Sequence, residues 1–170
     1  MDKRKYWIFS LAFTLSVIAD QLTKVWARTT LKAGHRTITI VDGYFDFVYS
    51  ENPGSAFGLL RDFEYGRYVL LIVGVFALGV IYSFLRKVRP ERPRIAVWLG
   101  LLAGGAVGNI IDRLVYQKVT DFVLWHVRDL HWPVFNVADA ALVVGVIALL
   151  VDARGDELSG APAKKDPVKA

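Results

Sequence analysis

The chain has 170 residues, 54% of them hydrophobic, and its mean hydropathy of +0.37 is higher than that of a typical soluble domain. The 21 Lys and Arg residues outnumber the 16 Asp and Glu residues. They cluster beside apolar segments, so membrane orientation explains them better than nucleic-acid binding, and we expect no nucleic-acid partner. Because cysteine is absent, disulfides, thiol nucleophiles and zinc–thiolate sites are excluded.

Four apolar stretches predict transmembrane helices, each of about 17–21 residues and therefore long enough to span a bilayer. The first is preceded by Lys3-Arg4-Lys5, which would also fit a cleavable signal peptide. Its apolar run is too long for that, and the polar segment Asp20–Lys24 follows, so we expect a retained helix. The predicted spans are residues 6–26, 68–85, 95–111 and 134–151.

The region after the first span predicts a small β-sheet. Residues Thr37–Val41 and Tyr44–Tyr49 alternate between apolar and polar side chains, and Asp42-Gly43 between them is typical of a hairpin turn. We expect this β region to cover about residues 28–66, with a turn at Pro53-Gly54. The expected fold class is an α-helical membrane protein with four transmembrane helices and a small outward-facing β-sheet region.

The positive residues predict which side each connection faces. Twelve of the 21 Lys and Arg residues fall before the first span, between the second and third spans, or after the fourth. These regions should be cytoplasmic, so both termini lie inside and residues 27–67 and 112–133 face outward. Residues 1–151 should form one integral membrane domain. Residues 152–170, rich in Gly, Pro, Ala and Lys, should form a disordered cytoplasmic tail.

Ionisable residues collect at the outer ends of the predicted helices. An ionisable side chain within a membrane segment costs several kcal/mol, so a functional role is the default hypothesis. Two carboxylates that reach the same point can act as an acid–base pair, one ionised and one protonated. Asp121 and Asp139 are the candidates for this pair. The polar residues near the same depth are Asp20, Asn109, Asp112 and Arg113.

Structural roles remain open for several of these residues. Asp112 and Arg113 would also fit an interfacial charge pair, and Asp20 and Lys24 have the i,i+4 spacing of helical partners. A purely structural role for Asp139 would require its carboxylate to form an ion pair with a cation such as Arg113. Asn109 and Asn136 would also fit helix caps or interhelical bridges.

Other functional classes fit less well. His35, His126 and His131 form no HExxH pattern, and the chain has no GxSxG motif, although Ser55 with Lys24 would fit a Ser–Lys pair. A proton-coupled transporter would need carboxylates across the whole membrane, and the cytoplasmic half offers no matching ones. A structural membrane subunit does not explain two acidic sites at one depth.

Five ordered motifs resemble those of the bacterial lipoprotein signal peptidases, also called signal peptidase II, a family of membrane aspartyl proteases. The motifs occur in the family's order between residues 20 and 139. They are Asp20-Gln-Leu-Thr-Lys24, Asn52-Pro-Gly-Ser-Ala-Phe57, Gly108-Asn-Ile-Ile-Asp-Arg113, Val119-Thr-Asp-Phe122 and Phe135-Asn-Val-Ala-Asp139.

The resemblance implies that Asp121 and Asp139 are the catalytic residues of an aspartic endopeptidase. It implies that the substrates are prolipoproteins whose cysteine carries diacylglycerol, cleaved on the N-terminal side of that cysteine at the outer leaflet of the bacterial inner membrane. It also implies no metal or organic cofactor, contact with membrane lipids, and inhibition by globomycin-type cyclic peptides. Positions matching substrate-binding or dyad-supporting residues are Asn52, Gly54, Asn109, Arg113 and Asn136; those matching structural or supporting residues are Asp20, Lys24 and Asp112.

Three positions depart from the commonest family pattern. Gln117 stands where many members have Gly, Ala140 where Ser is frequent, and Pro53 where Thr is often found. None of these departures removes a proposed catalytic group.

Overall fold

The computed structural model describes residues 3–53, 65–127 and 130–158. Gly54 and Ser55 therefore lie outside the described residues, as does most of the expected turn that follows Asn52. The elements in chain order are α1 (Arg4–Trp26), the π-helical segment η1 (Ala27–Lys32), β1 (Ile38–Val41), β2 (Phe45–Asn52), α2 (Gly66–Lys87), α3 (Pro93–Val115), β3 (Val119–Val127), β4 (Leu130–His131) and α4 (Val137–Leu158).

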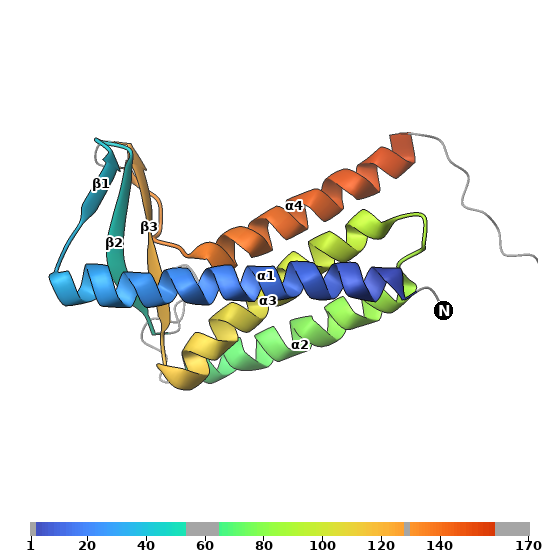
Figure 1. Ribbon diagram of the computed structural model, residues 1–170, viewed down its shortest axis with the longest axis horizontal. Helices are drawn as coiled ribbons and strands as arrows, with labels where there is room; N and C mark the ends of the chain where they lie inside the picture. The colour runs from blue at the N-terminus through green and yellow to red at the C-terminus, as the bar shows by residue number, and fades with distance from the viewer. Residues whose placement is uncertain (1–2, 54–64, 128–129, 159–170) are drawn as a thin grey trace, which may run out of the picture.

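The four long helices run alongside one another, and the sheet stands across one end of them (Figure 1). The first turn of α1 and the last turns of α4 lie at the opposite end. Three helical stretches in the described parts of the chain are long and apolar enough to cross a membrane: Arg4–Lys32, Gly66–Lys87 and Pro93–Val115. Helix α4, with 22 residues, corresponds to the fourth predicted span and carries charged residues near both ends. The predicted α-helical membrane architecture is confirmed.

Helix α3 occupies the middle of the bundle because small residues allow its neighbours to approach closely. A Cβ added at Gly104 would lie 2.6 Å from Ser16 Cβ of α1, and one added at Gly105 would lie 2.5 Å from the carbonyl oxygen of Ala138 in α4. Such small-residue contacts let membrane helices pack backbone against backbone. The polar side chains that α3 carries are therefore held close to both α1 and α4.

The sheet has the antiparallel order β1-β2-β3-β4 and is larger than the sequence predicted. The hairpin is present, with Gly43 at a φ of +75° in its turn. The expected limits of the β region, about 28–66, were wrong in two ways. Residues 28–32 continue the first helix, where Leu31 is buried against Phe122, and β3 joins the sheet from beyond α3. Ser50 of β2 is the register partner of Asp121 in β3.

The expected helix boundaries also need correction. Helix α4 begins at Val137 rather than at residue 134 and extends to Leu158, so the expected disordered tail does not begin at residue 152. Two contacts explain this extension. Trp98 Nε1 donates a hydrogen bond to Asp152 Oδ2 at 2.9 Å, and Arg94 Nε lies 2.9 Å from Asp152 Oδ1. Residues 159–170 lie outside the described part of the chain.

Candidate active site

The two aspartates reach one place because the segment before α4 is tied to β3. The backbone amides of Phe122 and Val123 both donate to the carbonyl of Phe135, at 3.0 and 2.8 Å, and Phe135 donates back to Val123 at 3.1 Å. This pairing sets Asn136, the next residue, beside Asp121 on the strand. Asp139 follows in the first turn of α4, and the two carboxylates therefore approach one another from different elements.

Asn136 and Asp139 cap the N-terminus of α4 reciprocally. The backbone N–H of Asp139 donates to Asn136 Oδ1 at 3.0 Å, and the backbone N–H of Asn136 donates to Asp139 Oδ2 at 3.2 Å. This exchange has the form of a capping box, and it satisfies backbone donors that a helix start leaves without partners. The side-chain amide nitrogen of Asn136 then points away from the helix and donates to Asp121 Oδ1 at 2.6 Å.

Asn109 of α3 supplies the second amide of the site. Its Nδ2 donates to Asp139 Oδ1 at 2.8 Å. Its Oδ1 accepts from Lys24 Nζ at 2.9 Å and from Asn136 Nδ2 at 3.2 Å. The two carboxylates are thus linked through two amide side chains, both of which are buried.

Burial controls the charge state of Asp121, whose residue is only 4% exposed. Burial, together with the nearby negative charge of Asp139, raises the pKa of Asp121 to about 7, although hydrogen bonds from Asn136 and Asn52 act in the opposite direction. A carboxyl group with this pKa retains its proton in a large fraction of molecules near neutral pH. This is the property expected of the acid in an acid–base pair.

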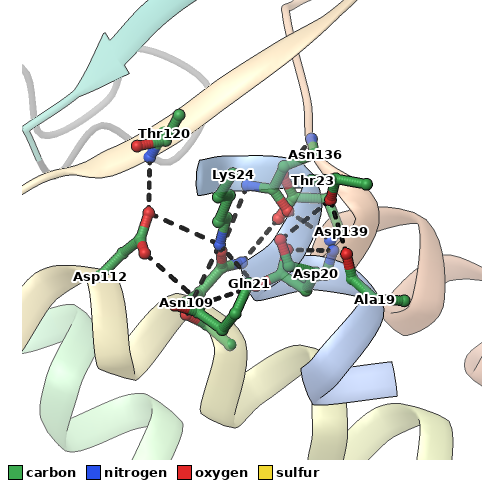
Figure 2. Close-up of polar contacts among 12 residues, drawn as sticks. Ala19, Asp20, Gln21, Thr23, Lys24, Asn109, Asp112, Thr120, Asn136 and Asp139 are labelled. Atoms are coloured by element: carbon green, nitrogen blue, oxygen red, sulfur yellow. Dashed lines mark hydrogen bonds and ion pairs between the residues drawn. The ribbon is translucent and has the colours of Figure 1, made fainter. Parts of the chain in front are cut away.

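A fully buried ionic network of Asp20, Lys24 and Asp112 adjoins the two amides (Figure 2). Lys24 Nζ lies 2.9 Å from Asp20 Oδ2 and 3.7 Å from Asp112 Oδ2, and all three side chains have zero exposure. Asp20 Oδ1 accepts the backbone N–H of Ala138 at 3.0 Å, and Asp112 Oδ2 accepts that of Thr120 at 2.9 Å. The network therefore attaches α1 and α3 to the residues immediately before Asp139 and Asp121.

The structural alternatives for the charged residues can now be compared with the contacts. Asp20 and Lys24 form the expected i,i+4 pair. Asp112 does not pair with Arg113: it lies near Lys24 and 3.5 Å from Arg28 Nη1. In the described residues, no ion pair joins Arg113 to Asp139. Arg113 Nη1 donates to the carbonyl of Asn109 at 3.3 Å, and its buried Nε has no partner there.

Of the remaining predicted residues, the structure describes Asn52 but not Gly54. Asn52 is the last residue of β2 and hydrogen-bonds to Asp121 through its side chain, whereas Gly54 is outside the described residues. In the described ranges, no group of three or more His, Asp or Glu side chains is arranged to hold a metal ion. The Ser–Lys alternative fits poorly because the ammonium group of Lys24 is already surrounded by carboxylate and amide oxygens.

Arg28 and Thr120 belong to the site and were missed by the sequence analysis. Arg28 Nη1 donates to Thr120 Oγ1 at 2.9 Å, and its guanidinium lies 4.2 Å from the centre of the Tyr116 ring. The sequence contains a pattern that could have indicated each of these two residues. Arg28 follows Lys24 at the i,i+4 spacing of one helical face, and residues 119–127 are rich in the β-branched and aromatic side chains that favour strands.

The chain is therefore a helical membrane protein with two buried carboxyl groups that are linked through two amides where the bundle meets the sheet. Comparison with known proteins identifies the family. The profile of the family described as Signal peptidase (SPase) II matches residues 12–154. The chain belongs to the signal peptidase II family, and it is therefore a peptidase.

Individual relatives and solved structures agree with this assignment. A lipoprotein signal peptidase of Geobacter sulfurreducens is 41% identical over 94% of this chain and 99% of its own length. One of Symbiobacterium thermophilum is 43% identical over 78% of this chain and 84% of its own length. A solved bacterial membrane enzyme has a TM-score of 0.76 at 28% identity and covers 92% of both chains. A second bacterial membrane enzyme has a TM-score of 0.72 at 30% identity, over 84% of this chain and 90% of that chain.

Proposed function

We propose that this peptidase removes signal peptides from diacylglyceryl-modified prolipoproteins, cleaving on the N-terminal side of the lipidated cysteine, with Asp121 and Asp139 as its catalytic dyad. The names of the relatives support the substrate class. The observation that carries the dyad is the hydrogen-bonded connection of both carboxylates through Asn136, whose side-chain amide donates to Asp121 and whose backbone N–H donates to the carboxylate of Asp139.

The hydrogen bonds suggest different roles for the two carboxylates. Both oxygens of Asp139 accept N–H donors, and the residue lies in the first turn of α4, where the helix dipole favours negative charge. Asp139 is thus suited to be the ionised base. Asp121, with its pKa raised by burial and by the charge of Asp139 to about 7, is suited to be the acid.

The reaction then follows from these roles. Asp139 takes a proton from a water molecule while the water oxygen attacks the scissile carbonyl carbon, and Asp121 donates its proton to the carbonyl oxygen. The tetrahedral diol collapses when a diol proton returns to Asp121 and the proton on Asp139 passes to the amide nitrogen of the cysteine. The C–N bond breaks, and both carboxyl groups regain their initial protonation.

Neighbouring polar groups are available to hold the substrate. The buried Nε of Arg113 has no partner within the described residues and is suited to a substrate carbonyl. Asn52 is suited to orient Asp121, and Gly54, which matches the family motif, is proposed to face the substrate backbone. The end of the molecule that carries the sheet should lie at the outer leaflet, where the lipid of the substrate is anchored.

The positive residues and the fold together support a topology. The first turn of α1 and the last turns of α4 lie at the end of the bundle opposite the sheet (Figure 1). We place this end in the cytoplasm of a bacterial cell, with the protein in the inner membrane and the dyad on the outer side. Membrane lipids would surround the exposed apolar faces of the helices, and globomycin-type peptides are expected to compete with the substrate.

The test is cleavage of a lipidated precursor by purified Asp121→Asn and Asp139→Asn variants. Each should lose nearly all activity, and the double variant should lose little more because both residues act in one step. Asp42→Asn, a change of the same kind in the exposed hairpin turn, should retain wild-type activity. The wild-type rate should fall as pH rises through about 7, where Asp121 loses its proton, and again at low pH, where Asp139 gains one.

Two results would contradict the proposal. Substantial turnover by either folded single variant would exclude a two-aspartate mechanism. Equal rates with lipidated and unlipidated precursor would exclude recognition of the lipid.

A further inference from the structure

We infer that Lys24 is a positioning residue for the reaction: its buried ammonium group sets the orientation of the Asn109 amide toward Asp139 and biases the protonation of the dyad. The inference rests on the proposed catalytic role of Asp121 and Asp139. It goes beyond a packing role for the Asp20–Lys24 pair, because it assigns to Lys24 an effect on the pH at which the enzyme works.

The first step of the argument is the chemistry of donors. An ammonium group has three donors and no acceptor, so the atom of Asn109 that faces Lys24 Nζ at 2.9 Å has to be the amide oxygen. The amide nitrogen is then on the other side, where it donates to Asp139 Oδ1 at 2.8 Å. If the amide were reversed, its oxygen would face a carboxylate and its nitrogen an ammonium group. Lys24 therefore prevents the orientation that would disfavour an ionised Asp139.

The second step concerns Asn136, which is oriented in a different way. The backbone N–H of Asp139 can only donate a hydrogen bond, as the ammonium group of Lys24 can. The atom of Asn136 that faces this N–H is therefore the amide oxygen. Its nitrogen consequently faces Asp121 Oδ1 and Asn109 Oδ1. The oxygen of Asn109 thus receives two donors, Lys24 and Asn136. The positive charge of Lys24 is linked to Asp139 through the Asn109 amide, and to Asp121 through the Asn109 and Asn136 amides.

The third step is the charge balance around the ammonium group. Asp20 of the same helix and Asp112 of α3 lie 2.9 and 3.7 Å from it, and Arg28 of η1 lies 3.5 Å from Asp112. Arg113 on α3, Asp121 on β3 and Asp139 on α4 are the other charged groups that face the site. Lys24 and its carboxylates have no exposure to water, so bulk solvent screens their charges little.

The effect on Asp121 has a definite sign. Burial and the charge of Asp139 raise the pKa of Asp121, and the positive charge of Lys24 acts against that rise. Removing the ammonium group should therefore raise this pKa further. Removing the negative charge of Asp112 should lower it, because the charge of Lys24 is then less compensated.

Two nearly isosteric variants test these signs through the pH profile of kcat/KM for a lipidated precursor. Lys24→Met should displace the profile by about one unit to higher pH and lower kcat about 10-fold or more, with KM little changed. Asp112→Asn, which keeps an oxygen for the N–H of Thr120, should displace the profile to lower pH. Lys5→Met is the matched control. Lys5 donates to the carbonyls of Arg86 and Val88 near the opposite end of the bundle, so its loss should leave the profile unchanged.

Opposite displacements in the two variants would support the inference, since a merely structural role lowers activity without moving the profile. A folded Lys24→Met enzyme with the wild-type profile would overturn it. If Lys24→Met does not fold, the Asp112→Asn profile decides: an unmoved or upward-displaced profile overturns the inference. The two proposals can fail separately. If Asp121→Asn and Asp139→Asn are inactive but the pH profiles of Lys24→Met and Asp112→Asn match the wild type, only the role of Lys24 is refuted. If the aspartate variants are active, the proposed function itself is refuted.

Discussion

Gly105 of α3 is a position at which one added methyl group should disturb the site through a contact with the backbone of α4. A Cβ at this position would lie 2.5 Å from the backbone carbonyl oxygen of Ala138 and 2.9 Å from Leu142 Cγ. The carbonyl belongs to the first turn of α4 and cannot rotate away as a side chain could. In Gly105→Ala, the start of α4 must therefore move away from α3.

The size of the movement follows from the distances. Carbon–oxygen contacts need about 3.3 Å, so α4 should shift by about 0.8 Å. Asn109 lies one helical turn after Gly105 on the same face of α3, and its 2.8 Å bond to Asp139 Oδ1 crosses the same interface. A bond stretched to about 3.6 Å is no longer a hydrogen bond. Losing a hydrogen bond to a charged group costs about 1.5–3 kcal/mol, or about 10- to 100-fold in kcat.

The assays are cleavage of lipidated precursor and the unfolding midpoint of the purified protein. Overpacking should cost about 1–3 kcal/mol of stability, of which the better helix propensity of Ala returns up to about 1 kcal/mol. Gly79→Ala in α2 is the matched control, because a Cβ there would meet nothing within 4 Å. It should leave activity unchanged. A Gly105→Ala enzyme with wild-type kcat would refute the close approach of α3 and α4 at the site.

Two further predictions concern other parts of the chain. Gln117 has a φ of +64°, a left-handed conformation that costs a residue other than glycine about 1 kcal/mol, so Gln117→Gly should raise the unfolding midpoint by about 2–4 °C. An unchanged or lower midpoint would show that its side chain compensates for the strain. The proposed topology predicts that a reporter fused after Lys87 lies in the cytoplasm and that an insertion near Gly43 is accessible from outside. A reporter fused after Lys87 that gives an external signal would exclude this topology.

The sequence was sufficient for the features that depend on local composition. Apolar runs long enough to cross a bilayer predicted the four long helices, because a membrane requires each segment to satisfy its own backbone hydrogen bonds. The hairpin at Gly43 was predictable for a similar reason, since its turn requires a positive φ. The boundaries were less accurate where a distant contact decided them, as at the end of α4, where Trp98 and Arg94 bind Asp152.

For the site, the sequence identified the residues but not the way in which they meet. Asp121 and Asp139 were recognisable because ionisable groups are costly near a membrane and because their motifs resemble a known family. Their connection depends on the pairing of β3 with Phe135 and on a cap in which Asn136 donates hydrogen bonds to both carboxylates, from its side chain to Asp121 and from its backbone to Asp139. These contacts join residues from separate elements, and no periodicity along the chain records such pairings. The orientation of the Asn109 amide likewise depends on a lysine 85 positions away, which only the packing of α1 against α3 brings within 2.9 Å.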